Sequence, residues 1–510
     1  MPVSTATPGV FVEEVPSGTR TLTGVATSIT AMVGRTRRGS VDVPLDCASW
    51  PDFERRCGGL WAESELGYAV HHFFVNGGGR VLVSRVAAGA ATATHGLGGA
   101  GGLRLAAADP GSWGDRLRVS VDHGVAGSVT AVSGPDAFHL TVEEIDPAVE
   151  VLRGYEQAVV AREFFTHVSV DPLSPRYVHT VLAQQSALIR ATAVPAARPA
   201  AGARLPFGGG SDGSVAQATD AAFEAAIGRL DQADLVNLMS VPPIARDRPT
   251  SAATWAAALA FCERRRAVLL VDPPDSWTRT ADAADLVGGM DAFRSNNSVF
   301  TFPRVMAADP LQQNASRPFA PSGAVAGVIA RTDAARGFWK AAAGTEATLR
   351  GLAGLERTLT DDDSGLLNPR GVNALRELSV VGPVVWGART GRGADVMASE
   401  WKYLPVRRTA LHIEESLVRG LRWAVFEPND HALWGQLRAS VTGFMQDLFR
   451  KGAFFGTTPS EAYLVRCDAT TTTPADAAVG VVNVVVGFAP LRPAEFVILT
   501  FQQMAGQSAT

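Results

Sequence analysis

The chain has 510 residues, enough for roughly two to four domains, and its 46% hydrophobic and 19% charged residues are typical of a globular protein. A formal net charge of −4 gives no reason to expect nucleic acid or an anionic membrane surface as a partner. The four cysteines include no C-x-x-C pair, which predicts reduced thiols in a cytosolic setting instead of a disulfide framework.

No targeting or membrane-spanning segment is expected from the sequence. The first residues, MPVSTATPG, contain neither a basic region nor an apolar core, so we expect no signal peptide. No apolar run approaches the ~20 residues that a spanning helix needs. We therefore predict a protein that is made and assembled in the cytoplasm without export by a signal.

The N-terminal stretch GVFVEEV, Gly9–Val15, has the composition of a β-strand and lies between Pro8 and Pro16. A lone strand is not stable in water because its backbone groups need partners. No second strand is expected close to it in the sequence. The stretch therefore predicts pairing with a strand from elsewhere.

A βααβ unit is predicted next. ITAMVG and RVLVSRVAA are expected to be buried strands. Ser49 as N-cap and Pro51 in the first turn indicate a short helix between them, and ESELGYAVHHFFVNGGG is expected to be a second helix that ends at three glycines.

Residues 88 to 205 are predicted to be an insertion. The stretch AAGAATATHGLGGAGG has low complexity and is interpreted as a flexible linker, and ATAVPAARPAAGARLPFGGGSDG as another. Between them, strands are expected at DPGSWGDRLRVSVDH, FHLTVEEI and EFFTHVSVDP, and a helix at PRYVHTVLAQQSALIRA. Because the same α/β pattern precedes and follows this region, we expect it to interrupt one domain.

Helices alternate with near-continuous apolar strands from residue 206 onwards, which predicts a parallel sheet covered on both faces. The C-terminal part is predicted to begin with strands at SVVGPVVWGAR and WKYLPV. A helix is expected over residues 407–426 from the spacing of Leu411, Leu417 and Val425, followed by a second helix that ends at FMQDLFRKG. EAYLVRCD, VGVVNVVVGFAP and AEFVILTF are predicted as final strands.

The motifs that could carry chemistry are incomplete. Residues 96–101 fit G-x-G-x-x-G, but no strand and helix flank them as a dinucleotide site requires. Residues 209–213 fit G-x-S-x-G, which would make Ser211 a nucleophile, although the preceding sequence is a poor buried strand. A glycine-rich turn with Asp212 or Ser214 capping the next helix is the other interpretation. The run Asp361–Asp363 indicates helix capping instead of a metal site. We predict no catalytic, cofactor or metal site.

A set of segments in chain order resembles contractile tail sheath proteins of phages and extracellular contractile injection systems. These segments are PGVFVEEVPSGTRTLTGVATSITAMVGRTRRG, DPGSWGDRLRV, LPFGGGSDG, PSGAVAGVIARTDAARGFWKAAAGTEATLRG, LLNPRGVNALREL, VVWGART, YLPVRRTALHIEESLVRGLRWAVFEPND and LWGQLRASVTGFMQDLFRKGAFFGTTPSEAYLVRCD. The resemblance spans nearly the whole chain and is weakest over residues 88–205.

The resemblance implies an α/β and α+β multidomain fold: a parallel-sheet domain with an inserted mixed domain, and a C-terminal α+β sheath domain with strand-donating arms. The boundaries we predict are 1–22 for the N-terminal arm, 23–87 and 206–370 for the α/β domain, 88–205 for the inserted outer domain, 371–490 for the C-terminal inner domain, and 491–510 for the C-terminal arm. Sheath subunits of this family polymerise around an inner tube and contract without nucleotide, so a structural protein without enzymatic activity is expected.

The resemblance also implies partners and contact residues. Both arms are expected to add strands to the sheets of neighbouring subunits. The strand-exchange residues are Gly9, Val10, Phe11, Val12, Glu13, Phe496, Val497, Ile498 and Leu499. The helix ending at Arg450 and Lys451 is expected to face the inner tube protein. The other interpretation is that these cations only stabilise the C-terminus of their own helix through its dipole. Baseplate and tail-terminating cap proteins are further implied partners, nucleic acid and membranes are not, and the particle is expected to be released by lysis.

Three alternatives stay open at this point. The terminal strands could pair within their own subunit, as terminal strands commonly do. The chain could be another tail polymer such as an inner tube protein, although its length disfavours this. In a different class, it could be an α/β hydrolase that uses Ser211.

Overall fold

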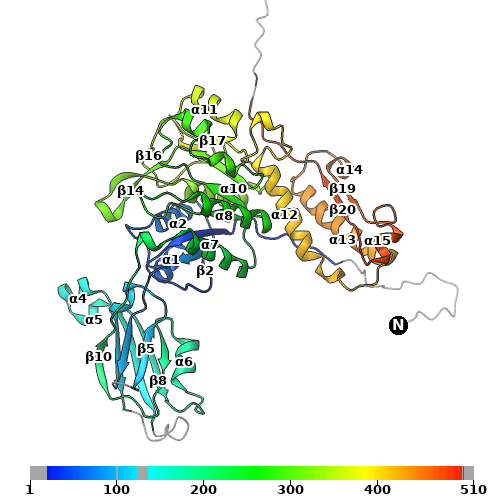
Figure 1. Ribbon diagram of the computed structural model, residues 1–510. Helices are drawn as coiled ribbons and strands as arrows, with labels where there is room; N and C mark the ends of the chain where they lie inside the picture. Colours follow the sequence, from blue (N-terminus) through cyan, green and yellow to red (C-terminus); the bar gives the residue numbers. More distant parts are fainter. Residues whose placement is uncertain (1–19, 99–100, 125–135, 497, 499–510) are drawn as a thin grey trace, which may run out of the picture. The chain divides into compact units, whose positions relative to one another are not determined.

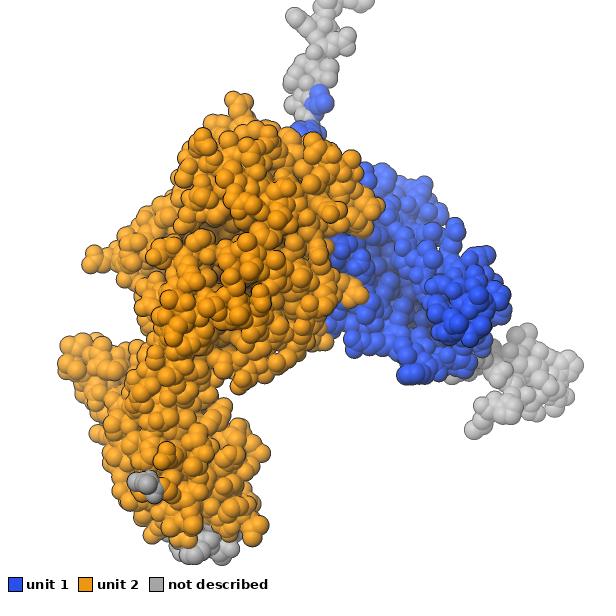
Figure 2. All heavy atoms as spheres, viewed as in Figure 1, with its two compact units in different colours: residues 1–27, 333–341, 403–510 blue, residues 28–332, 342–402 orange. Residues whose placement is uncertain are grey.

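The computed structural model describes residues 20–98, 101–124, 136–496 and 498. The chain forms two compact units, and each is described separately (Figure 2). Unit 1 comprises residues 1–27, 333–341 and 403–510, and unit 2 comprises residues 28–332 and 342–402. Residues 371–402, which we assigned from the sequence to the C-terminal domain, lie in unit 2.

Unit 2 is built around an eight-stranded sheet with the order β18-β17-β13-β12-β11-β1-β3-β2. Its strands are β1 (Thr30–Arg35), β2 (Leu45–Cys47), β3 (Val81–Val86), β11 (Leu238–Ser240), β12 (Val268–Val271), β13 (Ser298–Phe302), β17 (Val372–Leu378) and β18 (Gly382–Val385). The six inner strands are parallel, while β2 and β18 pair antiparallel at the two ends. The predicted parallel α/β sheet is confirmed.

Helices cover both faces of this sheet because its inner strands are apolar on both sides (Figure 1). The helices of unit 2 outside the inserted region are α1 (Trp50–Cys57), α2 (Leu66–Val75), α7 (Asp220–Arg229), α8 (Ala252–Arg264), α9 (Thr280–Ala284), α10 (Ser322–Arg336) and α11 (Asp361–Leu367). The segment of α10 from Ser322 to Ala330 is wholly buried. A Cβ at Gly323 would lie 2.2 Å from the Ala69 carbonyl oxygen, so glycine permits α10 to pack closely against α2.

A buried carboxyl lies at the carboxyl end of β12. Asp272 accepts hydrogen bonds from the Ser322 backbone N–H (2.8 Å) and hydroxyl (2.7 Å), and Ser322 is within 2.7 Å of the Ser240 hydroxyl. Burial raises the pKa of Asp272 to about 7. The start of α10 is thus fixed to the sheet by a polar group that gains its proton near neutral pH.

Residues 90–211 contain two further sheets. One has the order β4-β5-β9, with β4 (Thr94–Leu97), β5 (Leu103–Ala107) and β9 (Ile189–Ala193). The other has the order β10-β6-β7-β8, with β10 (Gly202–Pro206), β6 (Leu117–Asp122), β7 (Phe138–Ile145) and β8 (Val159–Val168). Short helices α4 (Pro147–Arg153), α5 (Tyr155–Ala158) and α6 (Val178–Gln185) accompany them. These strands and α6 enclose a hydrophobic core of their own.

Three sequence interpretations in this region are corrected. The low-complexity stretch before residue 103 is not a simple linker, because β4 and β5 form an antiparallel hairpin across it. The second linker contains β10, which pairs with β6. The predicted helix from residue 175 to 191 ends at Gln185, and Ile189 begins β9. In each case pairing with distant strands outweighs the local composition.

A small sheet, β15-β14-β16, completes unit 2 with β14 (Val305–Asp309), β15 (Ala315–Phe319) and β16 (Gly354–Leu355). Single-turn 3-10 helices lie between many of these elements: η1 (Ser112–Arg116), η2 (Val215–Gln217), η3 (Leu230–Gln232), η4 (Met290–Phe293), η5 (Pro310–Gln312), η6 (Asn368–Arg370) and η7 (Asp395–Met397).

Unit 1 is an α+β unit made of two long helices and a small sheet. Its elements are α12 (Leu404–Gly420), η8 (Arg422–Ala424), α13 (His431–Arg450), α14 (Pro459–Ala462), β19 (Tyr463–Arg466), α15 (Pro474–Ala478) and β20 (Val485–Phe488). The predicted strand WKYLPV is wrong, because α12 begins at Leu404 with Pro405 in its first turn. The predicted helix also ends earlier than expected, at Gly420, so Val425 lies beyond it and is 61% exposed.

Candidate functional site

The small sheet of unit 1 consists of β19 and β20, paired antiparallel from Tyr463↔Phe488 to Arg466↔Val485. In the part of the chain that the structure describes, no third strand joins this sheet. A lone two-stranded sheet is only marginally stable in water, and its outer backbone groups are free to pair with added strands. The outer edges of β19 and β20 are therefore open among the described residues.

One face of the small sheet is fixed to the helices of unit 1. Tyr463, Val465, Val486 and Phe488 pack on a buried cluster that includes Phe444 and Leu448 of α13. The Tyr463 hydroxyl donates a 2.7 Å hydrogen bond to Gln446 of the same helix. Leu464 and Val485 point the other way and are 42% and 46% exposed. The inner face thus anchors the two-stranded sheet to the helices, and the outer face exposes apolar side chains to solvent.

The segment that follows the N-terminal arm is held along α12. Val25 donates from its backbone N–H to the Ser416 hydroxyl (3.1 Å), and Arg408 donates to the Thr27 carbonyl oxygen (2.9 Å). The Arg20 guanidinium lies 4.7 Å from the centre of the Trp423 ring, just beyond the C-terminal end of α12. The first described residue, Arg20, therefore lies at this end of the helix.

The C-terminal arm leaves from the opposite end of α12. The hydroxyl of Tyr403, the residue before the helix, donates a 3.4 Å hydrogen bond to Glu495. A helix of 17 residues spans about 25 Å at 1.5 Å per residue. The two chain ends thus begin at points about 25 Å apart along one helix.

The interior of unit 1 beside the N-terminal segment contains His412. Its ring centre lies 4.2 Å from that of Phe338, and a Cβ at Gly24 would come within 3.1 Å of its Nε2. Burial, with smaller contributions from Arg408 and Lys451, lowers the pKa of His412 to about 4. The imidazole is therefore neutral at physiological pH and acts as a packing group.

Only two of the expected strand-exchange residues are described by the structure. Gly9, Val10, Phe11, Val12, Glu13, Val497 and Leu499 lie outside the described residues. Phe496 and Ile498 are 76% and 88% exposed, and residues 491–496 form no strand within the chain. Their pairing with another copy stays a prediction.

The two residues expected to contact an inner tube lie at the end of α13. Arg450 is the last residue of the helix and is exposed, and Lys451 is its C-cap. Lys451 forms a 2.6 Å ion pair with Asp447, with both side chains more than half exposed. Cations at this end also suit the helix dipole, so their position alone does not establish a tube contact.

Ser211 lies in a turn that is hydrogen-bonded to segments distant in the sequence. Ser211 and Ala91 exchange backbone hydrogen bonds of 2.8 and 3.0 Å, and the Ser211 hydroxyl accepts one from the Gly213 N–H at 3.3 Å. Asp212 accepts hydrogen bonds from the backbone N–H (2.8 Å) and hydroxyl (2.6 Å) of Ser112. The hydrolase alternative is not supported, because this turn is held by structural contacts and its aspartate faces Ser112.

The remaining polar motifs also have structural roles. Gly96 and Leu97 are the last residues of β4, and Gly98 and Gly101 lie in the turn that leads to β5, so a strand and not a helix follows the motif. Asp363 forms a capping box with Thr360 at the start of α11 and accepts a hydrogen bond from Thr280, as the capping interpretation predicts. Among the described residues, no three His, Cys, Asp or Glu side chains are grouped to hold a metal ion.

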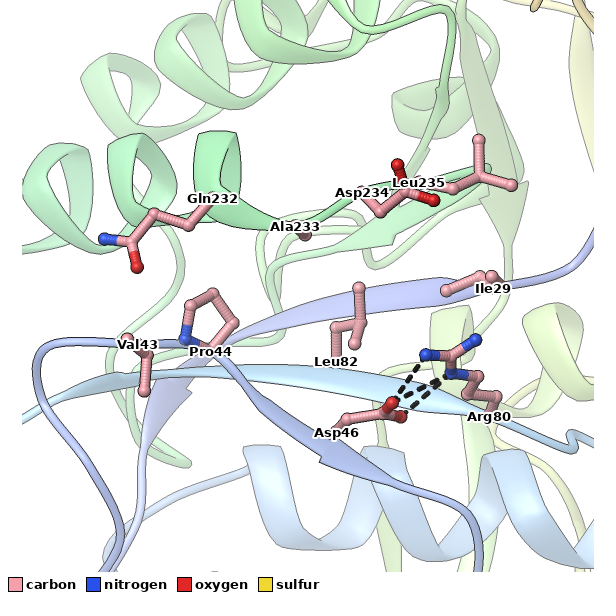
Figure 3. A pocket seen from close by; sticks show the side chains of 10 residues that line it. All are labelled: Ile29, Val43, Pro44, Asp46, Arg80, Leu82, Gln232, Ala233, Asp234 and Leu235. Carbon is pink, nitrogen blue, oxygen red and sulfur yellow. Dashed lines mark hydrogen bonds and ion pairs between the residues drawn. The ribbon is translucent and has the colours of Figure 1, made fainter. Parts of the chain in front are cut away.

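A pocket of about 300 Å³ opens in unit 2 at the starts of β1, β3 and β11 (Figure 3). Its walls are mostly aliphatic, and Asp46 and Arg80 form a bidentate ion pair at its edge, with the closest approach at 2.6 Å. Asp46 raises the pKa of Arg80 through this contact. The ten residues that line the pocket include four polar or charged residues, Asp46, Arg80, Gln232 and Asp234, and no serine, cysteine or histidine.

The comparisons with known proteins point to one class, the contractile tail sheath proteins, which this chain resembles in sequence and in fold. Residues 397–504 match the family model described as the phage tail sheath C-terminal domain, which contains α12, α13 and both strands of the open sheet. The resemblance predicted from the sequence is confirmed. In the described residues, no helix is long and apolar enough to cross a membrane.

Two curated relatives support this class. The chain is 33% identical over 161 residues to the tail sheath protein of Burkholderia phage BcepMu, and 29% identical over 199 residues to a prophage major tail sheath protein of Pseudomonas aeruginosa. These matches cover 30% and 38% of this chain. They cover only 33% and 48% of the two relatives, respectively.

The likeness to solved structures extends over almost the whole chain. The helical sheath of the anti-feeding prophage in its contracted state matches with a TM-score of 0.59 at 22% identity, covering 98% of this chain and 100% of that one. The contracted PVC sheath of an extracellular contractile injection system matches with 0.59 at 21%, covering 98% of both chains. A sheath tail protein from Listeria innocua matches with 0.62 at 13%, covering 92% and 96%. The chain thus has the sheath fold.

Proposed function

We propose that the chain is the structural sheath subunit of a contractile tail-like particle, which polymerises around an inner tube and contracts to drive that tube into a target. The observation that carries the proposal is the open β19–β20 sheet in a chain whose two ends begin at opposite ends of α12. A sheet that lacks strands and two long chain ends are complementary parts of a polymer.

In this proposal residues 9–13 and 496–499 of one copy add strands to the open sheets of its neighbours. The physics is strand addition, in which main-chain hydrogen bonds provide affinity and alternate side chains set the register. The exposure of Phe496 and Ile498 supports this arrangement, since their apolar side chains gain most by burial against another copy.

The further partners follow from the same arrangement. The C-terminal end of α13, with Arg450 and Lys451, faces the inner tube protein, and residues 88–205 lie on the outside of the assembled sheath. Baseplate and tail-terminating cap proteins bind the two ends of the polymer. In support, a chain in the baseplate structure of the anti-feeding prophage shares this fold. The subunit has no enzymatic activity and binds neither nucleic acid nor membrane. It assembles in the cytoplasm without a signal peptide, and lysis releases the particle.

Negative-stain microscopy of the purified chain, with and without its inner tube protein, tests the proposal. We expect long tubes with a helical surface pattern. A chain that stays monomeric under all conditions, including in the presence of the tube protein, contradicts the proposed function.

A further inference from the structure

The turn between α12 and α13 presents an exposed aromatic residue on a strained backbone. Phe426 has a φ of 71° and its side chain is 102% exposed. A positive φ is unfavourable for a bulky L-residue because its Cβ crowds the backbone, so such positions usually carry glycine or asparagine. Within the described chain, the Phe426 ring gains no burial that offsets this strain. Strained residues of this kind collect at functional sites.

The turn around Phe426 is held by hydrogen bonds on both sides. The Glu427 N–H donates to the Ala424 carbonyl oxygen (3.3 Å), which closes the turn on one side. On the other side, the Asn429 side chain donates to the Val481 carbonyl oxygen (3.1 Å) and accepts from the Trp434 indole N–H (2.8 Å). Because the turn is already ordered, burying the Phe426 ring against a partner costs little conformational entropy.

Other apolar side chains surround this turn. Val425 is 61% exposed, and the Asn429 hydrogen bond brings the segment containing Val479 (76%) and Val481 (42%) to the same place. We call Val425, Phe426, Val479 and Val481 the Phe426 patch. Single exposed apolar residues are ordinary on a protein surface, whereas a group of them marks an interaction site.

The position of the patch indicates which partner covers it. Arg20, the first described residue, stacks on Trp423, three residues before Phe426. The described chain thus begins beside the patch, and a copy that pairs with residues 9–13 is joined to this point by the short segment that precedes Arg20. We propose that Phe426 is the anchor of a contact with a second copy of this chain, the neighbour that receives the N-terminal arm. This inference rests on the proposed function and adds a side-chain contact to the exchange of strands.

The variant Phe426→Gly tests the anchor, because a structural role and an interface role predict opposite results. Glycine accepts the positive φ, and the ring is fully exposed in the described part of the chain, so we expect the Tm of the monomer to stay unchanged or to rise by a few degrees. We expect at least a tenfold loss of polymer in a sedimentation assay. A lowered Tm, or polymer at the wild-type level, overturns the proposal.

Leu173→Ala is the matched control, since Leu173 is an apolar residue of similar exposure (92%) in the inserted region of unit 2. This control should assemble like wild type, and equal loss of assembly in both variants overturns a specific role for Phe426. Failure of the wild-type chain to form tubes contradicts the proposed function itself. Wild-type tubes together with intact Phe426→Gly tubes contradict only this inference.

Photo-crosslinking identifies the partner directly. With p-benzoyl-phenylalanine at position 426 in assembled particles, we expect a product of twice the chain mass of 53.5 kDa, joining two copies. A crosslink to the inner tube protein, a crosslink only to residues 1–19 of the same chain, or no crosslink overturns the proposal.

Discussion

The eight-stranded sheet of unit 2 and the two-stranded sheet of unit 1 differ in whether their edge strands are covered. At one end of the large sheet, β18 is covered by residues 344–349, which exchange backbone hydrogen bonds with Pro383 and Val385 at 2.8–3.0 Å. At the other end, β2 has only three residues, and the Arg56 side chain donates to the carbonyl oxygen of Asp46. The small sheet has no such cover among the described residues. Among the described residues, the large sheet has covered ends and the small sheet has open edges.

This difference shows where cohesion between copies can arise. Covered edges prevent unwanted pairing, while open edges invite it. Among the described residues, the long sheet has covered ends, while the short sheet of unit 1 offers open edges to an added strand. The predictions below test whether unit 1 depends on other copies while unit 2 does not.

The largest effect is expected at the C-terminal arm. Ile498→Pro removes a backbone donor that a paired strand needs, so we expect no tubes in a sedimentation assay. Because Ile498 is 88% exposed in the single chain, the melting curve of the monomer should match that of wild type. Ile498→Val, which keeps the donor, should assemble normally. A destabilised monomer, or normal tubes from the proline variant, would show that this strand is not exchanged.

A second prediction concerns the internal stability of unit 1. Arg408 donates hydrogen bonds of 2.8 and 2.5 Å to the Asp333 carboxylate, and both side chains are buried. Arg408→Met leaves that carboxylate without its partner, so we expect unfolding to become easier by about 3–5 kcal/mol in urea. The double variant with Asp333→Leu should recover much of the loss, since no unpaired charge remains. A loss below about 1 kcal/mol would mean that the pair is not needed.

The third prediction tests the interior of unit 2 through pH. The pKa of Asp272, about 7, lies above its unfolded value of 3.8, so the folded chain binds more protons between pH 4 and 7. Stability therefore falls as pH rises through this window, by up to about 4 kcal/mol from this group.

Asp272→Asn keeps the polar contacts to Ser322 without a charge, so its urea stability relative to wild type should rise between pH 5 and pH 8. The exposed Glu400→Gln serves as the control and should show no such change. A constant difference between Asp272→Asn and wild type at the two pH values would refute the assignment.

The smallest effect on folding is expected at the end of α13. Reversing the charges of Arg450 and Lys451 to glutamate breaks only the exposed pair with Asp447, so the monomer should lose at most about 1 kcal/mol. In the particle the same charge change is repeated in every subunit, and we expect the inner tube to be released. Arg153→Glu, on the exposed helix α4, should retain the tube. Unchanged tube retention in the double variant would exclude these residues as tube contacts.

The parts of the fold that sequence reasoning found are those with strong local patterns. The apolar runs of β1 and β3 and the capped start of α1 at Ser49 gave the parallel sheet and its first helices. The predictions failed where distant residues decide. The hairpin of β4 and β5 lies in a glycine- and alanine-rich stretch whose strand character depends on pairing with β9. WKYLPV alternates like a strand, yet Pro405 is tolerated in the first turn of α12.

The candidate site was only partly predictable. The strand character of the chain ends is visible in their sequence, but the open edges of β19 and β20 appear only once the other strands of the chain are placed. The sequence predicts a helix that ends at Phe426, because Val425 continues the apolar spacing of α12. The helix instead ends at Gly420, and the exposure and positive φ of Phe426 have no signal in the sequence.

The two chain ends begin at opposite ends of α12. This placement affects how a polymer of this chain would transmit mechanical force. If each copy gives two strands and receives two, as proposed, it has four links. The two that it gives start about 25 Å apart at the ends of α12, and the two that it receives join the β19–β20 sheet. Links at separate points connect the copies into a network instead of a linear series. Tension can then pass around any one copy by more than one path. Breaking a single link would then leave the neighbouring copies connected, so damage would stay local.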